Sequence, residues 1–254
     1  MNYNDWINWK KSINTERLMV EVYGRKHIEI LTDDCRGYWV FCMKGTQKEK
    51  VDIIRNELIN NKPELFVDLG ANYGEFTAGI CDLNINTLCI EPNPKVASCL
   101  KNSFKDDDHV TIIDKFCGDV HNGTVEFNIN PNYSGGGSMY ENVIKSWSDG
   151  RYSEIHKNHE VVKVGSINLV NTIKEVYGKI PSSIFIKMDV EGYEDEIMIS
   201  VEDMLNDISW WRVFYEYNEN AIRLAGKNIE DWKKIFGKYE TYGDYTGDLL
   251  IGNK

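Results

Sequence analysis

Acidic side chains follow apolar runs at several points of the chain, and the first of these points also carries two glycines. Residues 68–74 read Asp-Leu-Gly-Ala-Asn-Tyr-Gly and follow a short apolar run. Gly70 and Gly74 lack a Cβ, so the backbone can turn tightly and a ligand can lie against it. Asp68 would end a buried strand, the place where open α/β sheets bind ligands. A carboxylate there repels a pyrophosphate and favours a cationic ligand.

A second acidic residue, Glu91, ends the next apolar run and precedes Pro-Asn-Pro. An acidic residue about 20 positions after the first glycine of such a turn binds the two hydroxyls of a ribose. The dinucleotide fingerprint needs a further glycine where this chain has Ala71 and Asn72. The ordered pair therefore favours S-adenosylmethionine, whose sulfonium and amino groups are positive. Asp119, just past a third strand, is a candidate for the adenine amino group, and a plain turn aspartate is the alternative.

A third acidic group lies at residues 186–194, Ile-Lys-Met-Asp-Val-Glu-Gly-Tyr-Glu. Asp189 and Glu191 follow a buried strand here, and Glu216 lies near the end of the next one. Neighbouring parallel strands would gather the three carboxylates at one rim. Such groups repel one another, so one of them keeps a proton or a cation binds, and either condition helps to deprotonate an alcohol. The sequence leaves open that Asp189 and Glu191 cap a helix or pair with basic neighbours such as Lys187.

Alternating strand and helix patterns must position these residues, and they predict an α/β fold with a doubly wound sheet. The first expected strand starts at Leu65 and has Asp68 at its carboxyl end. The other expected strands cover residues 87–91, 110–116, 125–129, 161–164, 183–188 and 212–217, followed by a closing pair at 239–242 and 249–252. The expected helices cover residues 75–83, 95–104, 169–177 and 229–236.

The segments around this sheet are expected to shape the site. Residues 1–50 are predicted to form an elaboration with a β-hairpin, a strand at 37–43 and the start of a helix, leaving 51–254 as the cofactor-binding domain. The Gly- and Asn-rich loop 130–138 is predicted to be a lid over cofactor or substrate. His156 and His159 are candidate bases, and solvent-facing histidines are the alternative.

The amino-acid composition limits the kinds of molecule and the compartment that we expect for this protein. The 254 residues carry 29 basic and 40 acidic side chains, a net charge of −11, which argues against nucleic acid as the main partner. Six cysteines without a Cys-x-x-Cys pair indicate buried thiols in a reducing compartment. The chain has no apolar run that fits a bilayer or a signal peptide. We therefore expect a cytoplasmic protein that acts on a small molecule or glycan without inserting into a membrane.

The three motifs together resemble the FkbM-type S-adenosylmethionine-dependent methyltransferases, over about residues 51–251. The resemblance implies a Rossmann-like class I methyltransferase fold, with a seven-stranded, mostly parallel sheet, helices on both faces and a final antiparallel strand. It also implies O-methylation of a hydroxyl, often on a sugar. By motif position it assigns Asp68, Gly70, Asn72 and Gly74 to the methionine end of the cofactor, Glu91 to the ribose, and Lys187, Asp189 and Glu191 to the reacting end. Residues 166–168, Ser-Ile-Asn, depart from the usual Thr-Leu-Asp of that family.

Other functions stay open at this point. A nicotinamide-dependent oxidoreductase would share the sheet and the ribose carboxylate, and a non-catalytic S-adenosylmethionine-binding module would share the glycine turn. Methylation of RNA ribose is a weaker alternative because the chain is acidic. A divalent cation bridging the carboxylates is compatible with the chemistry, but the spacing fixes no metal-ligand geometry.

Overall fold

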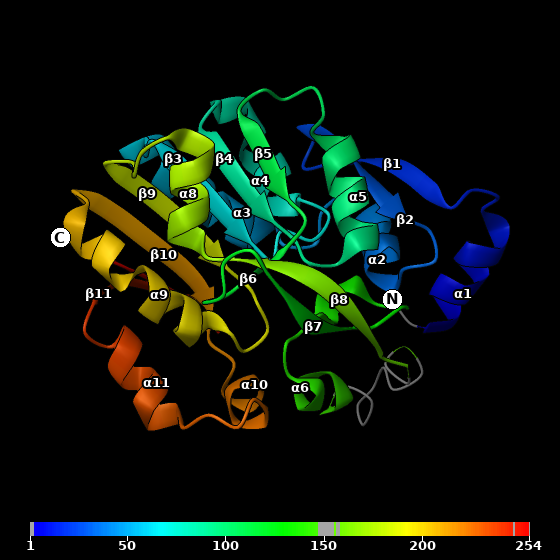
Figure 1. The fold of residues 1–254 in the computed structure, drawn as a ribbon. Helices are drawn as coiled ribbons and strands as arrows, with labels where there is room; N and C mark the ends of the chain where they lie inside the picture. Colours follow the sequence, from blue (N-terminus) through cyan, green and yellow to red (C-terminus); the bar gives the residue numbers. More distant parts are fainter. Residues whose placement is uncertain (1–2, 147–154, 156–157, 246, 254) are drawn as a thin grey trace.

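The computed structural model describes residues 3–146, 155, 158–245 and 247–253 (Figure 1). Its centre is a seven-stranded sheet in the order β11-β12-β10-β9-β3-β4-β5. The strands of this sheet are β3 (Leu65–Leu69), β4 (Asn86–Ile90), β5 (Val110–Ile113), β9 (Ser183–Met188), β10 (Trp210–Glu216), β11 (Glu240–Tyr245) and β12 (Asp248–Gly252).

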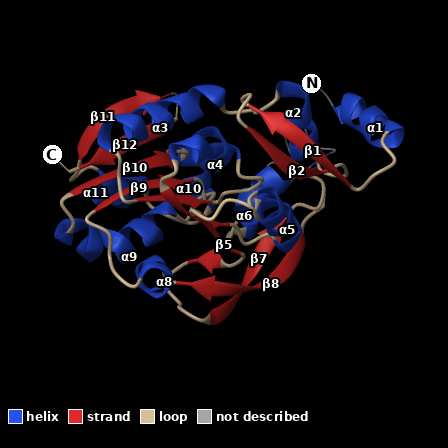
Figure 2. Ribbon diagram, turned by 90° about the horizontal axis from the view of Figure 1, so that it is seen from above, coloured by secondary structure: helices blue, strands red, loops and turns tan. Residues whose placement is uncertain are grey.

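Helices cover both faces of this sheet, as Figure 2 shows. One face packs under α3 (Lys48–Asn61), α4 (Glu75–Ile80) and α5 (Pro94–Ser103), and the other under α8 (Leu169–Tyr177), α9 (Glu194–Asp207) and α11 (Ile229–Phe236). All five residues of β3 are buried. A strand that is covered on both faces reads as a continuous apolar run, which is why the sequence predicts it well.

Strand directions confirm the predicted fold class. β3 pairs in parallel with both β4 and β9, and β9 pairs in parallel with β10. The last strand, β12, lies antiparallel between β10 and β11. This arrangement is the seven-stranded, mostly parallel sheet with a final antiparallel strand.

A second, three-stranded sheet lies beside the first, in the order β6-β8-β7. Its strands are β6 (Phe116–Cys117), β7 (Gly123–Ile129) and β8 (Glu160–Ile167), and α6 (Glu141–Ser146) lies between β7 and β8 in the chain. The prediction of one strand over 110–116 is wrong, because β5 ends at Ile113 and β6 belongs to the second sheet. The chain leaves the main sheet at Asp114, which pairs with Lys101 at 2.7 Å, and Phe116 then packs on Phe127.

The N-terminal residues form α1 (Tyr3–Ser12), the hairpin of β1 (Arg17–Val22) and β2 (Lys26–Leu31), and α2 (Cys35–Met43). The hairpin confirms its prediction and packs beside α5 (Figure 1). The prediction of a strand over 37–43 is wrong. Asp34 caps a helix there by accepting a hydrogen bond from Arg36 N at 3.1 Å, and the helix lies so close to β2 that a Cβ on Gly37 would meet Leu31 O at 2.5 Å. The division at residue 50 stays a prediction.

Within the described part of the chain, every helix is too short or too polar to cross a bilayer. The short helix α10 (Glu219–Leu224) follows β10 and is capped by Asn218, whose side chain accepts a hydrogen bond from Ala221 N at 3.1 Å. Two single turns of 3-10 helix lie at Cys81–Leu83 and Ser134–Gly136.

Candidate functional site

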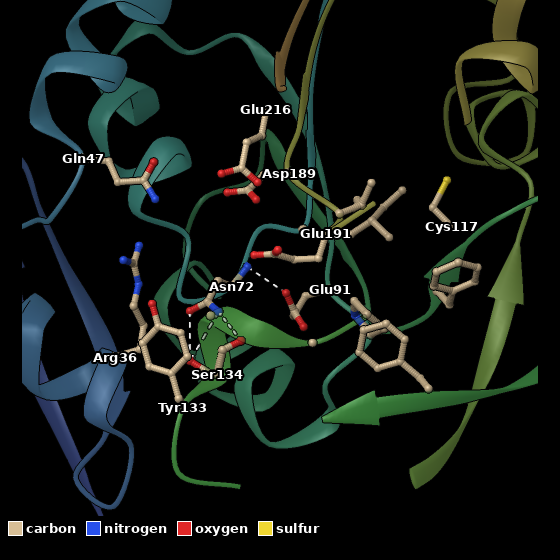
Figure 3. A pocket seen from close by; sticks show the side chains of 18 of the residues that line it. Arg36, Gln47, Asn72, Glu91, Cys117, Tyr133, Ser134, Asp189, Glu191 and Glu216 are labelled. Carbon is tan, nitrogen blue, oxygen red and sulfur yellow. Dashed lines mark hydrogen bonds between the residues drawn. The ribbon is translucent and has the colours of Figure 1, made fainter. Parts of the chain in front are cut away.

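A pocket of about 290 Å³ lies at the carboxyl ends of β3, β4, β9 and β10 (Figure 3). Its wall combines the predicted motifs with residues of the N-terminal segment and of the loop around Ser134. The lining residues are Arg36, Gln47, Lys50, Gly70, Asn72, Ile90, Glu91, Pro92, Phe116, Cys117, Phe127, Tyr133, Ser134, Gly135, Gly137, Asp189, Val190, Glu191, Glu216 and Asn218.

The glycine turn after β3 brings Asn72 and Glu91 together. Asn72 N donates to Glu91 Oε2 at 2.8 Å, and Asn93 N donates to Glu91 Oε1 at 2.8 Å. Gly70 has a φ of +69°, and a Cβ on it would meet Asp189 O at 1.9 Å, so this position requires glycine. The turn therefore joins the ends of β3, β4 and β9 into one rigid wall.

The carboxyl of Glu91 is almost completely buried, with 6% of the residue exposed. Burial raises its pKa to about 7, against the opposing effect of the two backbone N–H donors. Each of its oxygens has capacity for a further hydrogen bond, which is what two ribose hydroxyls would supply. Phe116 and Cys117 line the same pocket and give it an apolar surface on which an adenine ring could pack.

The three carboxylates predicted to share one rim do so. Oxygen atoms of Asp189, Glu191 and Glu216 all lie within 4.8 Å of one another, and their side chains point into the pocket (Figure 3). Burial and then the charges of Asp189 and Glu194 raise the pKa of Glu216 to about 8. Burial and then the neighbouring carboxylates, Glu216 first, raise the pKa of Glu191 well above its usual range. The cluster therefore holds a proton near neutral pH.

The backbone around Glu191 is fixed from two sides. Ser138 Oγ donates to Glu191 O at 2.8 Å, and Glu194 accepts hydrogen bonds from Val190 N and Gly192 N, each at 3.1 Å. Glu191 itself has a φ of +53°, which is uncommon for a residue with a side chain. These contacts hold the Glu191 carboxyl in the pocket although its backbone conformation is unfavourable.

Asp68 and Lys187 lie beneath the pocket wall. Lys187 Nζ is 3.1 Å from Asp68 Oδ1 and donates to Leu69 O and Gly70 O at 3.2 and 2.9 Å. Thr77 donates to the other oxygen of Asp68 at 2.9 Å. Burial lowers the pKa of Lys187, but the charges of Asp68 and of other acidic neighbours outweigh burial and raise it, so the ammonium keeps its charge. This ion pair supports the glycine turn from below.

The loop around Ser134 is held against the N-terminal segment and the glycine turn. Ser134 Oγ donates to Asp34 Oδ2 at 2.6 Å, Ser134 N donates to Asp34 Oδ1 at 2.9 Å, and Asn72 Nδ2 donates to Ser134 O at 3.0 Å. Tyr73 also donates to Asp34, at 2.5 Å. The loop predicted to be a lid thus forms a wall of the pocket.

The predicted site residues fall into two groups. Five of them line the pocket: Gly70, Asn72, Glu91, Asp189 and Glu191. Four do not line it: Asp68, Gly74, Asp119 and Lys187. Gly74 begins α4 with a φ of +82°, and Asp119 is exposed and accepts a long contact of 3.5 Å from Tyr193. Their roles as direct ligands stay predictions.

The sequence offered His156 and His159 as candidate bases, and it did not indicate several residues of the pocket. His159 does not line the pocket and lies 3.0 Å from Glu141, and His156 falls outside the described residues. The missed residues are Arg36, Gln47, Lys50 and Asn218, whereas Ser134 lies in the predicted lid loop. Arg36, Gln47 and Lys50 lie in the N-terminal segment predicted to shape the site, and Asn218 directly follows the strand predicted to end near Glu216.

Comparisons with known proteins bear on this arrangement. The family model described as "Methyltransferase FkbM domain" matches residues 68–241. No functionally curated protein matches the sequence. Among solved structures, the chain is similar to the SAH-bound methyltransferase PaMTH1 of Podospora anserina, with 11% identity and a TM-score of 0.48 over 82% of this chain and 80% of that one.

Two further solved structures show similarity of the same degree. A putative caffeoyl-CoA O-methyltransferase of Staphylococcus aureus shares 12% identity, with a TM-score of 0.48 over 85% of this chain and 89% of that one. An O-methyltransferase of Bacillus cereus in complex with SAH shares 8% identity, with a TM-score of 0.44 over 82% and 81%. These likenesses are too distant to identify a substrate. The family match confirms the predicted family, and with it the methyltransferase fold.

Proposed function

Because the chain belongs to the FkbM methyltransferase family, we propose that it transfers the methyl group of S-adenosylmethionine to a hydroxyl of a sugar, glycan or related metabolite. The observation that carries the O-methyl assignment is the group of three carboxylates in the pocket, within 4.8 Å of one another. An alcohol must lose its proton to become a methyl acceptor, and a carboxylate in such a cluster is the base that this requires.

The pocket residues fit this cofactor. Glu91 offers its carboxylate to the ribose, Phe116 and Cys117 offer an apolar surface to the adenine, and Gly70 and Asn72 lie toward the methionine end. When bound, S-adenosylmethionine supplies a methyl group on a positively charged sulfur. The carboxylates of the pocket attract that charge, because opposite charges attract more strongly in a partly buried site than in water.

The chain contributes orientation and proton removal. The turn after β3 and the two backbone N–H donors on Glu91 hold the cofactor side of the pocket. Either Asp189 or Glu191 takes the one proton of the acceptor hydroxyl. Holding both reactants in attack geometry is worth about 7–11 kcal/mol, and a positioned base about 10²–10⁴-fold in rate. Lys187 acts as a positioning residue beneath the turn, since it binds the carbonyls of Leu69 and Gly70.

Calorimetric titration with S-adenosylhomocysteine, with NAD as the control ligand, tests the cofactor. Micromolar binding of S-adenosylhomocysteine alone supports the proposal, and a preference for NAD contradicts it.

A radiolabelled methyl-transfer assay on sugar and glycan acceptors then tests the reaction. Asp189→Asn and Glu191→Gln should keep the affinity for S-adenosylhomocysteine and lower transfer by about 10²–10⁴-fold. If wild-type protein binds the cofactor but methylates no hydroxyl acceptor, the non-catalytic binding module becomes the better interpretation.

A further inference from the structure

Two pocket side chains from the N-terminal segment have polar atoms that nothing in the described part of the chain satisfies. Arg36 Nε and Gln47 Oε1 are shielded from solvent, and neither has a hydrogen-bond partner among the described residues. Both residues line the pocket, and both precede residue 68, where the match to the family model begins. A buried polar atom without a partner is costly, so the two atoms indicate a missing ligand group.

The structure holds both side chains in place. Arg36 Nη2 donates to Glu75 Oε2 at 2.5 Å, and 12% of the Arg36 side chain is exposed. Gln47 precedes α3, but its side chain makes no capping hydrogen bond and points into the pocket instead (Figure 3). Thr46 N donates to Glu75 Oε1 at 2.6 Å, so one carboxylate fixes the backbone next to Gln47 and the guanidinium of Arg36.

The two side chains lie on the pocket side that faces away from the predicted adenine surface. In Figure 3, Arg36, Gln47 and Tyr133 stand on one side and Cys117 on the other, with the carboxylate cluster between them. An acceptor bound by Arg36 and Gln47 would therefore place its hydroxyl near Asp189 and Glu216.

The missing ligand group must both donate and accept hydrogen bonds. Arg36 Nε carries a hydrogen and can only donate, whereas Gln47 Oε1 can only accept. A hydroxyl does both, so adjacent hydroxyls of one molecule satisfy the two atoms together. Tyr133 adds an aromatic ring to the same wall.

Charge selects against an anionic acceptor. The two cationic side chains of the pocket already have carboxylate partners: Arg36 pairs with Glu75, and Lys50 Nζ lies 2.6 Å from Asp248 Oδ2. The cluster of Asp189, Glu191 and Glu216 lines the same pocket as these two side chains. A phosphate or carboxylate on the acceptor would meet this cluster without an unpaired cation to balance it.

We propose that Arg36 and Gln47 are specificity-determining residues that bind an uncharged, polyhydroxylated acceptor in preference to its phosphorylated form. This inference rests on the proposed methyltransferase function, and it assigns acceptor selection to the N-terminal segment that precedes the matched domain.

Saturation-transfer NMR and calorimetry on protein saturated with S-adenosylhomocysteine test the proposal. The probes are the methyl glycosides of glucose, galactose and mannose and the corresponding 6-phosphates. We expect a neutral glycoside to bind, with its phosphate about tenfold weaker or more. Two variants should each weaken binding of the glycoside about tenfold. Arg36→Lys keeps the positive charge opposite Glu75 but removes Nε–H, and Gln47→Met keeps the length of the side chain but removes Oε1.

Matched measurements separate the possible failures. Arg55→Lys is the control, because Arg55 pairs with Asp82 at 2.5 Å and does not line the pocket, and it should change neither affinity. Affinity for S-adenosylhomocysteine, measured on every variant, reports folding and the cofactor site.

Three results would overturn the proposal: no glycoside binds, the phosphates bind as tightly as the glycosides, or the Arg36 and Gln47 variants weaken S-adenosylhomocysteine instead. Loss of S-adenosylhomocysteine binding by the wild-type protein would be a failure of the proposed function itself.

Discussion

Replacing Glu91 by glutamine should weaken S-adenosylhomocysteine binding, and a matched control separates this loss from the accompanying loss of stability. The carboxylate accepts hydrogen bonds from Asn72 N and Asn93 N, each at 2.8 Å, and Glu91 also lines the pocket. A hydrogen bond to a charged group contributes about 1.5–3 kcal/mol, so losing the one to the ribose should weaken binding about 10- to 150-fold. Calorimetry at pH 8.5 measures this, because the pKa of Glu91 is about 7 and the carboxyl is then ionised.

Glu194→Gln is the matched control. Glu194 is also buried, also has a pKa of about 7, and also accepts two backbone N–H groups, but it does not line the pocket. In both variants an amide NH₂ replaces one carboxylate oxygen, so a buried backbone N–H loses its hydrogen-bond acceptor. This loss should lower the free energy of unfolding by about 1–3 kcal/mol. Both should therefore lower the urea midpoint, and only Glu91→Gln should lower the affinity. Equal affinities in the two variants would refute the assignment of Glu91 to the ribose.

Three further predictions concern stability. Burial gives Glu91, Glu194 and Glu216 pKa values of about 7, 7 and 8, above those of an unfolded glutamate, so the folded chain binds more protons. The free energy of unfolding without ligand should therefore fall as the pH rises from about 4.5 to 8, by at most about 1.4 kcal/mol per pH unit for each of the three groups. Urea unfolding measured across this pH range tests it, and a free energy that does not change with pH would contradict it. Lys187→Met should lower the free energy of unfolding by about 3–5 kcal/mol, because it leaves the buried carboxylate of Asp68 without its cation. In the same urea-unfolding assay, the double variant Lys187→Met/Asp68→Leu should recover part of this loss. Gly70→Ala should lower the melting temperature by several degrees, since its Cβ would lie 1.9 Å from a backbone oxygen just past β9; an unchanged melting temperature would show that the turn can move.

The parts of the site that lie at strand ends could be predicted from the sequence. β3, β4, β9 and β10 are short runs buried by helices, and the residues that follow them must meet at one edge of a parallel sheet. That rule placed Glu91 beside the glycine turn and gathered Asp189, Glu191 and Glu216. Local pattern and global topology agree here, so no distant contact was needed to make the prediction.

The N-terminal contribution could not be read in the same way. Residues 38–41, Tyr-Trp-Val-Phe, have the composition of a strand, yet they form α2 because Asp34 caps the helix and is itself held by Tyr73 and Ser134. Ser134 lies 100 positions further along the chain. The presence of Arg36 and Gln47 in the pocket follows from such contacts, which have no periodic signature in the sequence.

Asp68 belongs to the predicted motif, but its carboxylate contacts protein groups and does not line the pocket. The residue type and position suggested a carboxylate for a cationic ligand, but Lys187 and Thr77 occupy its two oxygens, and the residue is fully buried. A buried carboxylate paired with an ammonium presents little net charge to the pocket. The acidic side chains that line the pocket are Glu91 and the cluster of Asp189, Glu191 and Glu216. Lys187 joins this carboxylate to the carbonyls of Leu69 and Gly70, so the ion pair fixes the start of the glycine turn between the two acidic walls.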